Sequence, residues 1–297
     1  MKHAERTFGD TLLKVDNITL RFGGVKAITD VSFEIREKQI FAIIGPNGAG
    51  KTSMLNVING FYHPQEGTIT YKGNPRHQMK PHEAAETGIA RTFQNVALFR
   101  GMSTLDNVMT GRLLKMSGPS MRYYHNKLAN MPVINYLTYP AMWFGDFLLD
   151  SLYWGPYQKE EVAHRKAAEE VIDFLEIQSI RRTPVGRLPY GLQKRVELGR
   201  ALAMEPDLLL LDEPMAGMNL EEKEDMCRFV IDVNDEFGTT IALIEHDMGV
   251  VMDISDHVVV LNYGRKISEG TPAVVQADQD VIDAYLGVAH EEDLIET

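Results

Sequence analysis

A loop suited to phosphate binding lies near the N-terminal end of the sequence. Its residues match the spacing G-x-x-x-x-G-K-[ST] at every fixed position. In order they are Gly45, Pro46, Asn47, Gly48, Ala49, Gly50, Lys51 and Thr52. Glycines let backbone N–H groups close around phosphate oxygens, and the start of a following helix adds positive potential. We expect Lys51 to reach the β- and γ-phosphates of a nucleoside triphosphate, and the Thr52 hydroxyl to bind Mg²⁺.

A second segment places two acids at the end of an apolar run. Leu208–Leu211 is followed directly by Asp212 and Glu213. Carboxylates at the end of a buried strand are suited to holding Mg²⁺ and to activating an attacking water. The alternative is an acid pair that only ends a strand. Because the glycine loop and the acid pair serve the same reaction, we predict that the chain binds ATP and hydrolyses it.

The elements around these segments alternate between strand and helix. The strands predicted from apolar runs are Leu12–Val15, Ile18–Phe22, Val31–Ile35, Ile40–Ile44, Thr68–Tyr71, Ile89–Phe93, Leu208–Leu211, Thr240–Ile244, Val258–Leu261 and Lys266–Ser268. The predicted helices are Lys51–Asn59, Pro81–Thr87, Leu220–Phe237, Met248–Ile254 and Thr271–Ala277. Such alternation predicts an α/β fold with a parallel core sheet.

The middle of the chain, from about residue 100 to 204, shows helical spacing and is predicted to be an insertion in the α/β core. Within it, residues 116–158 are rich in aromatics and include both tryptophans, Trp143 and Trp154. Amphipathic aromatics favour half-wet positions, so this segment could contact a permease or the membrane interface. The interpretation we favour is packing against the chain's own helices. Residues 288–297 are predicted to be an acidic tail.

Composition limits the partners of the chain. The formal net charge of −12 argues against a broad nucleic-acid surface, so we predict no nucleic-acid partner. The single cysteine, Cys227, excludes an internal disulfide and suits a reducing cytoplasm. The most apolar long stretch, 133–154, is interrupted by Asp146 and Asp150, which argues against a membrane span. Any membrane role is expected to come through a partner.

A third motif lies between the first two and carries a family resemblance. Leu188–Gln193 has the sequence LPYGLQ and leads into a predicted helix from Lys194 to Leu202. It resembles the L-S-G-G-Q signature of the ATP-binding-cassette (ABC) family, and the family's other motifs occur in the same order. The resemblance covers about residues 12–287 and implies one cassette domain. Its implied fold is a P-loop NTPase with a RecA-like parallel core sheet, an antiparallel β subdomain and a helical signature subdomain.

The resemblance implies a role for each further motif residue. Phe22 would stack on adenine; otherwise it is an edge-strand core residue. Gln94 would touch Mg²⁺ and the water site, rather than being a plain surface amide. Asp212 would hold Mg²⁺, Glu213 would orient and polarise the attacking water, and His246 would contact the γ-phosphate.

The signature departs from the family pattern. Pro189 replaces the serine, so both a hydroxyl and a backbone N–H are lost, although proline suits the first turn of a helix. Tyr190, Gly191 and Leu192 would still close on ATP bound to the opposite subunit, through a weaker or differently made contact. Function therefore implies a dimer. Asn219 stands where the family has an aspartate, which keeps hydrogen bonding but removes a charge.

Several local strings are similar to one branch of the family. They are Arg21–Gly24, Arg91–Gln94, Tyr190–Gly191, Ala216–Asn219, Glu245–Met248 and Asp280–Gly287. Together they resemble the longer of the two ATPase subunits of bacterial branched-chain, or hydrophobic, amino-acid importers. That resemblance implies two integral-membrane permeases, a second paralogous ATPase and, indirectly, a periplasmic binding protein. It places the chain peripherally on the cytoplasmic face of the inner membrane.

Two alternatives stay open. One is the ATPase of a lipopolysaccharide-type lipid exporter, which keeps a regular signature and lacks the extra helical segment. The other is a non-transport cassette ATPase that acts in DNA repair or on ribosomes. This chain has neither the long coiled coils of the first such group nor the two cassettes of the second.

Overall fold

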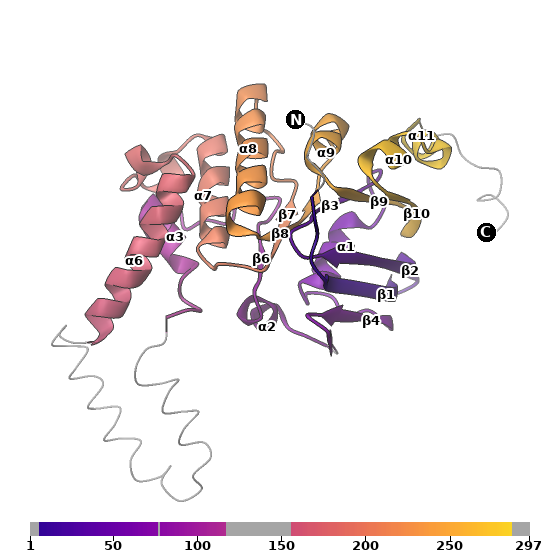
Figure 1. Cartoon of the computed structure of the whole chain (residues 1–297), viewed down its shortest axis with the longest axis horizontal. Coiled ribbons are helices and arrows are strands. Elements are labelled where there is room, and N and C mark those ends of the chain that lie inside the picture. Colours follow the sequence, from indigo (N-terminus) through magenta and orange to yellow (C-terminus); the bar gives the residue numbers. More distant parts are fainter. Residues whose placement is uncertain (1–5, 77, 117–155, 287–297) are drawn as a thin grey trace, which may run out of the picture. The chain divides into compact units, whose positions relative to one another are not determined.

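The computed structural model describes residues 6–76, 78–116 and 156–286 (Figure 1). The predictions for most of the aromatic segment 116–158 and for the tail 288–297 fall outside these residues. The chain divides into two compact units. The first comprises Met1–Ala97, Pro189–Lys194 and Glu205–Thr297, and the second comprises Leu98–Leu188 and Arg195–Met204.

The centre of the first unit is a six-stranded sheet in the order β10-β9-β3-β8-β7-β6. Its strands are β3 (Ile40–Ile44), β6 (Ile89–Arg91), β7 (Leu208–Asp212), β8 (Thr240–Ile244), β9 (His257–Asn262) and β10 (Arg265–Gly270). All the pairings are parallel except that of β10 with β9. Every residue of β3, β7 and β8 is buried, which explains why these strands are continuous apolar runs rather than alternating ones.

A second, four-stranded sheet is antiparallel, in the order β2-β1-β4-β5. Its strands are β1 (Thr11–Phe22), β2 (Val25–Arg36), β4 (Glu66–Tyr71) and β5 (Asn74–Arg76). The predicted α/β class, with a parallel core sheet and an antiparallel β part, is therefore confirmed.

Two predicted strands, Leu12–Val15 and Ile18–Phe22, are wrong as separate elements, because β1 is continuous with an irregular register between them. Asn17 sits there with φ of 50°, and its side-chain amide donates to Asp30 Oδ1 over 2.7 Å. Asp30 itself has φ of 52° and lies within β2, which begins at Val25 rather than at Val31. The polar pair therefore marks a bulge inside a hairpin, not a break between strands.

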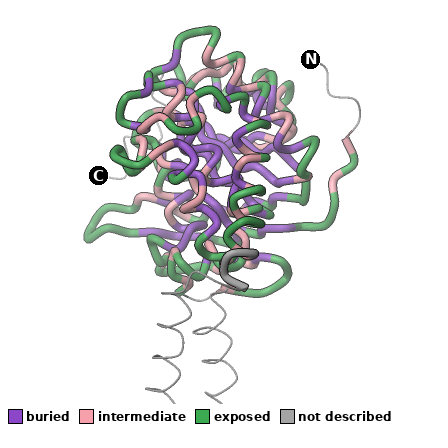
Figure 2. Tube along the Cα trace, turned by 90° about the vertical axis from the view of Figure 1, so that its left-hand side faces the viewer, coloured by how far each residue is buried: buried purple, intermediate pink, exposed green. Residues whose placement is uncertain are grey.

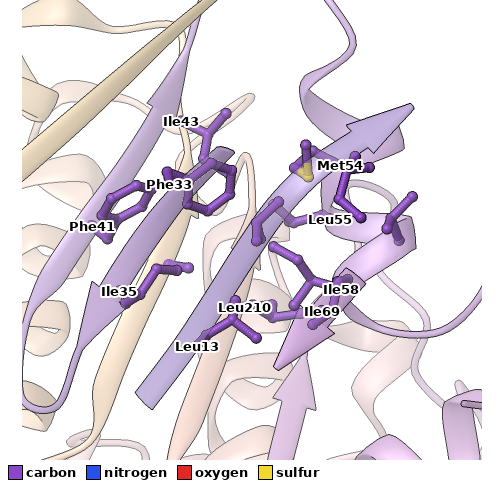
Figure 3. Packing of buried hydrophobic residues seen from close by; sticks show 14 of the residues in the cluster. Leu13, Phe33, Ile35, Phe41, Ile43, Met54, Leu55, Ile58, Ile69 and Leu210 are labelled. Carbon is purple, nitrogen blue, oxygen red and sulfur yellow. The ribbon is translucent and has the colours of Figure 1, made fainter. Parts of the chain in front are cut away.

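Helix α1 (Lys51–Ile58) follows β3 and packs into a core shared by both sheets. Figure 3 shows Leu55 of α1 in the same apolar cluster as Leu13 of β1 and Leu210 of β7. All three are fully buried, and truncating one such leucine to alanine typically costs about 2–5 kcal/mol. The loop before α1 is therefore anchored to a rigid core. Buried residues concentrate on the strands (Figure 2).

The remaining helices of the first unit are α2 (Pro81–Glu86), α8 (Leu220–Phe237), α9 (Met248–Ile254), α10 (Pro272–Gln276) and α11 (Gln279–Leu286). The short helices α10 and α11 lie beside β10 (Figure 1). Neither β5 nor α11 was predicted from sequence. Asn219 caps α8: its Oδ1 accepts a hydrogen bond from the Glu222 N–H over 2.9 Å, and Glu222 returns the contact.

The second unit is helical. It contains α3 (Thr104–Thr110), α6 (Pro156–Phe174), most of α7 (Tyr190–Leu202) and two short 3₁₀ turns at Gln178–Ile180 and Val185–Arg187. Ser103 caps α3, and Arg112 ties the unit together by donating to His164 Nδ1 and to the Ala203 carbonyl, over 3.1 and 2.8 Å. Across the described ranges, no helix combines the length and the apolar character needed to cross a membrane.

Candidate functional site

The glycine loop connects β3 to α1, and its backbone requires glycine at specific positions. Gly45, Gly48 and Gly50 have φ of 145°, 82° and 98°. A Cβ on Gly45 would lie 2.0 Å from the Leu261 carbonyl oxygen, and one on Gly50 would lie 2.6 Å from that of Ala27. The loop is therefore closely packed against β9 and β2, and only glycine fits at these two points.

Lys51, the first residue of α1, points back into this loop. Its ammonium donates to the carbonyl oxygens of Gly45 and Pro46 over 2.7 and 2.9 Å, and the residue is only 6% exposed. Burial lowers the pKa of this ammonium, whereas the carboxylates of Glu213 and Asp212 act in the opposite direction. The loop thus holds a fixed cation near two acids before any ligand binds. Thr52, the next residue, is exposed.

Asp212 ends β7 and is 2% exposed. One carboxylate oxygen accepts a hydrogen bond from Arg91 Nη2 over 2.8 Å, and Arg91 is itself held by Asn56 Oδ1 at 2.6 Å. The other oxygen, Oδ1, is buried with no hydrogen-bond partner among the described residues. A buried carboxylate oxygen without a partner is costly, and a cation would satisfy it. The oxygens of Asp212 and Thr52 are the hard ligands that Mg²⁺ prefers, so the donor set fits the predicted metal.

The three residues predicted to be catalytic meet around one carboxylate. Glu213 Oε2 accepts a hydrogen bond from Gln94 Nε2 over 2.8 Å, and Glu213 Oε1 lies 2.6 Å from His246 Nε2. Each residue follows the end of a different parallel strand, β6, β7 or β8, and these strands are neighbours in the sheet. Ligand sites of open α/β sheets lie at this carboxyl edge.

The backbone at Glu213 is unusual. Its φ is 50°, in the left-handed region, and its N–H donates to the Ile244 carbonyl of β8 over 3.0 Å. Left-handed backbone in a non-glycine residue is sparsely populated and is commonly found at functional sites. The hydrogen bond to β8 fixes this conformation, so the carboxylate is aimed by the sheet rather than by a free loop.

Phe22 lies at the hairpin end of β1 and is 46% exposed. Its ring contacts Tyr62 edge-on, with centroids 4.9 Å apart. It is therefore not a core residue, and an exposed ring surface is available for a base. Its position agrees with the predicted stacking role.

The signature residues Tyr190 and Gly191 lie against the segment that follows Glu213 and the start of α8. Tyr190 is 42% exposed and its ring lies 3.2 Å from where a Cβ on Gly217 would sit. Gly191 is buried against Glu222, at the start of α8. Leu192, by contrast, is half-buried. This segment therefore faces the connection after Glu213.

Sequence reasoning missed two side chains that support the site. Arg91 was noted only as part of a branch-like string, yet its guanidinium holds Asp212. An arginine that ends a short apolar strand was the available signal. Lys194, buried in α7, donates to the backbone carbonyls of Gln94 and Phe93 over 2.9 and 3.2 Å. This contact links the signature segment to the Gln94 loop, and no sequence signal pointed to it.

A glycine loop closed by a buried lysine, together with acids at the carboxyl edge of a parallel sheet, defines a P-loop nucleoside triphosphatase. Comparison with known proteins gives the family. The family described as "ABC transporter" matches residues 28–216, and that described as "Branched-chain amino acid ATP-binding cassette transporter" matches residues 265–291. The chain belongs to the ABC transporter family and is an ATPase of that family.

Curated relatives cover almost the whole chain. The high-affinity branched-chain amino acid transport ATP-binding protein BraF of Pseudomonas aeruginosa is 34% identical over 278 residues, which are 94% of this chain and 98% of the relative. LivG of Salmonella typhimurium, with the same descriptive name, is 36% identical with the same coverage. LivG of Escherichia coli K12 is 34% identical.

Solved structures agree. An ATP-binding cassette of an ABC transporter in its ADP conformation has a TM-score of 0.74 and 28% identity, covering 93% of this chain and 99% of that one. A nucleotide-free cassette gives a TM-score of 0.73 at 28% identity, covering 93% and 98%. The predicted fold and family are confirmed.

Proposed function

We propose that this chain is the ATP-hydrolysing subunit that powers import of branched-chain or other hydrophobic amino acids. The observation that supports hydrolysis is the Glu213 carboxylate held between Gln94 and His246 at the edge of the sheet. Support for the substrate class comes from the match of residues 265–291 and from the relatives named for branched-chain amino acid transport.

Nucleotide binding would use the glycine loop, the Lys51 ammonium and the exposed ring of Phe22. The ammonium already lies against the loop carbonyls, and the third of its three N–H groups can point to a phosphate oxygen. The N–H groups of the loop and of the start of α1 add further donors. Because the loop is packed against β2 and β9, binding requires little ordering of the backbone.

Thr52 and Asp212 would hold Mg²⁺, with Gln94 beside them. Bound there, Mg²⁺ would neutralise charge on the phosphate oxygens. Glu213 would accept a hydrogen bond from the attacking water and polarise it. Both carboxylate oxygens of Glu213 have partners, His246 and Gln94. Each oxygen keeps a further lone pair that can accept a hydrogen bond from the water, so His246 can stay beside Glu213 while it contacts the γ-phosphate.

The complete site requires two subunits. Tyr190, Gly191 and Leu192 would cover the nucleotide of a second ATPase, which is either a paralogue or, in isolation, another copy of this chain. Closure would move the Gln94 loop, and Lys194 joins that loop to the signature segment. Two permease subunits in the membrane would receive this movement at the cytoplasmic face, and a binding protein outside would deliver the amino acid.

A purification from native membranes tests this assembly. Tagged full-length chain should recover two permeases and a second cassette ATPase, identified by mass spectrometry. The recovered complex, placed in proteoliposomes with its binding protein, should take up labelled leucine when supplied with ATP. The same complex carrying Glu213→Gln should assemble but not transport. Recovery of a lipid-export scaffold, or of partners that are not membrane proteins, would contradict import and support one of the two alternatives left open by the sequence.

A further inference from the structure

One buried acid next to the site has no part in the proposed chemistry. Glu245 follows β8 directly and precedes His246, and it is 4% exposed. Its Oε1 accepts a hydrogen bond from the Met215 N–H over 2.8 Å, and its Oε2 accepts one from the His246 N–H over 3.2 Å. One carboxylate therefore bridges the segment after β7 and the segment after β8.

These two segments carry the groups that meet at the reaction centre. Glu213 lies two residues before Met215, and its carboxylate is 2.6 Å from His246 Nε2. A backbone hydrogen bond from Glu213 to Ile244 joins the two segments. The Glu245 carboxylate joins them a second time, so the residues next to both Glu213 and His246 are held together.

The surroundings of Glu245 make its ionised form expensive to keep. Burial raises the pKa of this carboxyl and the nearby Glu213 carboxylate adds to the rise, while the Met215 and His246 N–H groups and the His246 side chain lower it. From α8, Cys227 and the Lys223 ammonium also interact electrostatically with it, and Lys223 is held by Asp247 at 2.9 Å. An apolar side chain would avoid this cost but would leave the buried Met215 N–H and the partly buried His246 N–H without this acceptor.

We propose that Glu245 is a positioning residue for ATP hydrolysis, which fixes the spacing between the Met215 segment and His246 and thereby holds His246 against Glu213. This role rests on the proposed function of Glu213 and His246 in hydrolysis. Both of its carboxylate oxygens accept hydrogen bonds from backbone N–H groups, so it acts through its neighbours.

The test is ATP hydrolysis by the full-length chain carrying Glu245→Gln, with Mg²⁺ and ATP at fixed protein concentration. Glutamine keeps the size but offers one acceptor, and its NH₂ group faces the second N–H. We expect kcat to fall about tenfold with the KM for ATP changed less than about twofold, because only the reacting geometry is disturbed. Glu245→Leu, which removes both acceptors, should lower kcat by about a hundredfold.

Asp207→Asn is a matched control. Asp207 precedes β7, at the opposite end of that strand from the site, and pairs with Lys72 on the surface at 2.6 Å. Its replacement should leave kcat, KM and the melting temperature unchanged. The melting temperature of Glu245→Gln should also stay within about 2 °C of the parent, since a single exchanged hydrogen bond changes stability little compared with a lost core contact.

A chain that already lacks the His246 side chain separates a positioning role of Glu245 from general damage to the fold. In a chain with His246→Ala, adding Glu245→Gln should cost little more, because residues that act as a unit are not additive. A full additional tenfold loss would overturn the proposal, as would parental kcat in Glu245→Gln, or a loss of kcat that matches the loss of folded protein. If Glu213→Gln is inactive while Glu245→Gln is normal, the positioning role alone fails. Near-normal turnover of Glu213→Gln would overturn the role of Glu213 and the positioning role with it.

Discussion

The two segments expected to bind phosphate, the glycine loop Gly45–Thr52 and the signature segment Leu188–Gln193, differ in how much of a site each one builds. The glycine loop is packed against β9 and β2 and contains a buried ammonium. In the signature segment, a buried leucine is followed by an exposed proline and an exposed tyrosine, and the buried glycine lies against a glutamate. The glycine loop contains most of the groups expected to bind phosphate, whereas the signature segment exposes residues that would contact another subunit.

This difference shows that the chain carries two unlike halves of a site. Under the proposed function, the glycine loop would bind nucleotide without a partner, because its cation, its turns and its acids come from one unit. The signature segment would act only on the nucleotide of another subunit. We therefore expect changes in the glycine loop to affect binding by the isolated chain, and changes in the Glu213 carboxylate or in the signature segment to affect turnover alone.

The largest effect is expected from Glu213→Gln, which removes the reacting carboxylate from the complete half. Turnover should fall by about 10²–10⁴-fold, the range for loss of a positioned general base. ATP binding should persist, since Lys51 and the loop are untouched. Phosphate release and binding of a fluorescent ATP analogue measure the two quantities. Near-normal turnover would remove Glu213 from its role.

Lys51→Ala should weaken the binding of ATP. It deletes a charge-assisted contact to phosphate, worth about 1.5–3 kcal/mol, so the Kd for ATP should rise about 10- to 150-fold. Lys72→Ala, a surface lysine paired with Asp207, is the matched control and should bind as the parent does. Equal affinities for the two variants, measured by calorimetry, would contradict the role of the loop lysine.

Gly191→Ala tests the signature half. The new methyl group would meet the carboxylate of Glu222, which also caps α8, so the Glu222 side chain has to move and its capping contact is disturbed. We expect ATP binding unchanged and turnover lowered about tenfold, the scale of a misplaced contact. Mixing this variant with Lys51→Ala chains should recover part of the turnover, because a mixed pair has one intact site. Recovery of none would contradict completion between copies of this chain.

Pro189→Ser should have a smaller, opposite effect. The substitution returns a hydroxyl and a backbone N–H, each worth about 1 kcal/mol in a hydrogen bond. Turnover at low protein concentration should rise about two- to fivefold, with less change at saturating concentration. If turnover by Pro189→Ser depended on protein concentration as turnover by the parent does, Pro189 would not weaken the contact between subunits.

The smallest effect concerns Cys227, which lies on α8 with its sulfur 3.6 Å from that of Met215. Burial raises the pKa of this thiol to about 11. Only the thiolate reacts, so at pH 8 iodoacetamide should modify the native chain far more slowly than the unfolded one. The native rate should climb as pH rises toward the raised pKa. Mass spectrometry follows both rates, and equal rates would show that the packing behind the Met215 segment is loose.

Features of the fold and of the candidate site could be predicted from the sequence where they depend on contacts that are local in the chain. The glycine loop, the acid pair, Gln94 and His246 could be found because each follows an apolar run, and parallel strands bring their carboxyl ends to one edge. Helix Gln279–Leu286 was missed although its apolar residues, at positions 281, 282, 285 and 286, recur at helical spacing. The strand Asn74–Arg76 has only three residues and no periodic pattern. The bulge at Asn17 and Asp30 was missed for another reason, because polar residues inside a hairpin look like a turn.

The supporting contacts of the site were the least accessible from sequence. Arg91 and Asp212 are 121 residues apart, and Lys194 and Gln94 are 100 apart. Each contact depends on the order of strands in the sheet or on the path of α7, which no local pattern encodes. In the sequence, Glu245 is one polar residue after an apolar strand. Its two backbone partners are apparent only in the structure.

The buried pair of Arg91 and Asp212 also bears on which divalent ion the chain would select. Since the guanidinium holds one carboxylate oxygen, Asp212 would offer a metal chiefly its other oxygen, beside the Thr52 hydroxyl and the Gln94 amide. Ca²⁺ takes six to eight oxygen ligands and favours several carboxylates, whereas Mg²⁺ keeps much of its water and binds through one or two protein groups plus substrate phosphates. Because an arginine holds one carboxylate oxygen, we expect the chain to bind Mg²⁺ in preference to Ca²⁺, although the two ions carry equal charge.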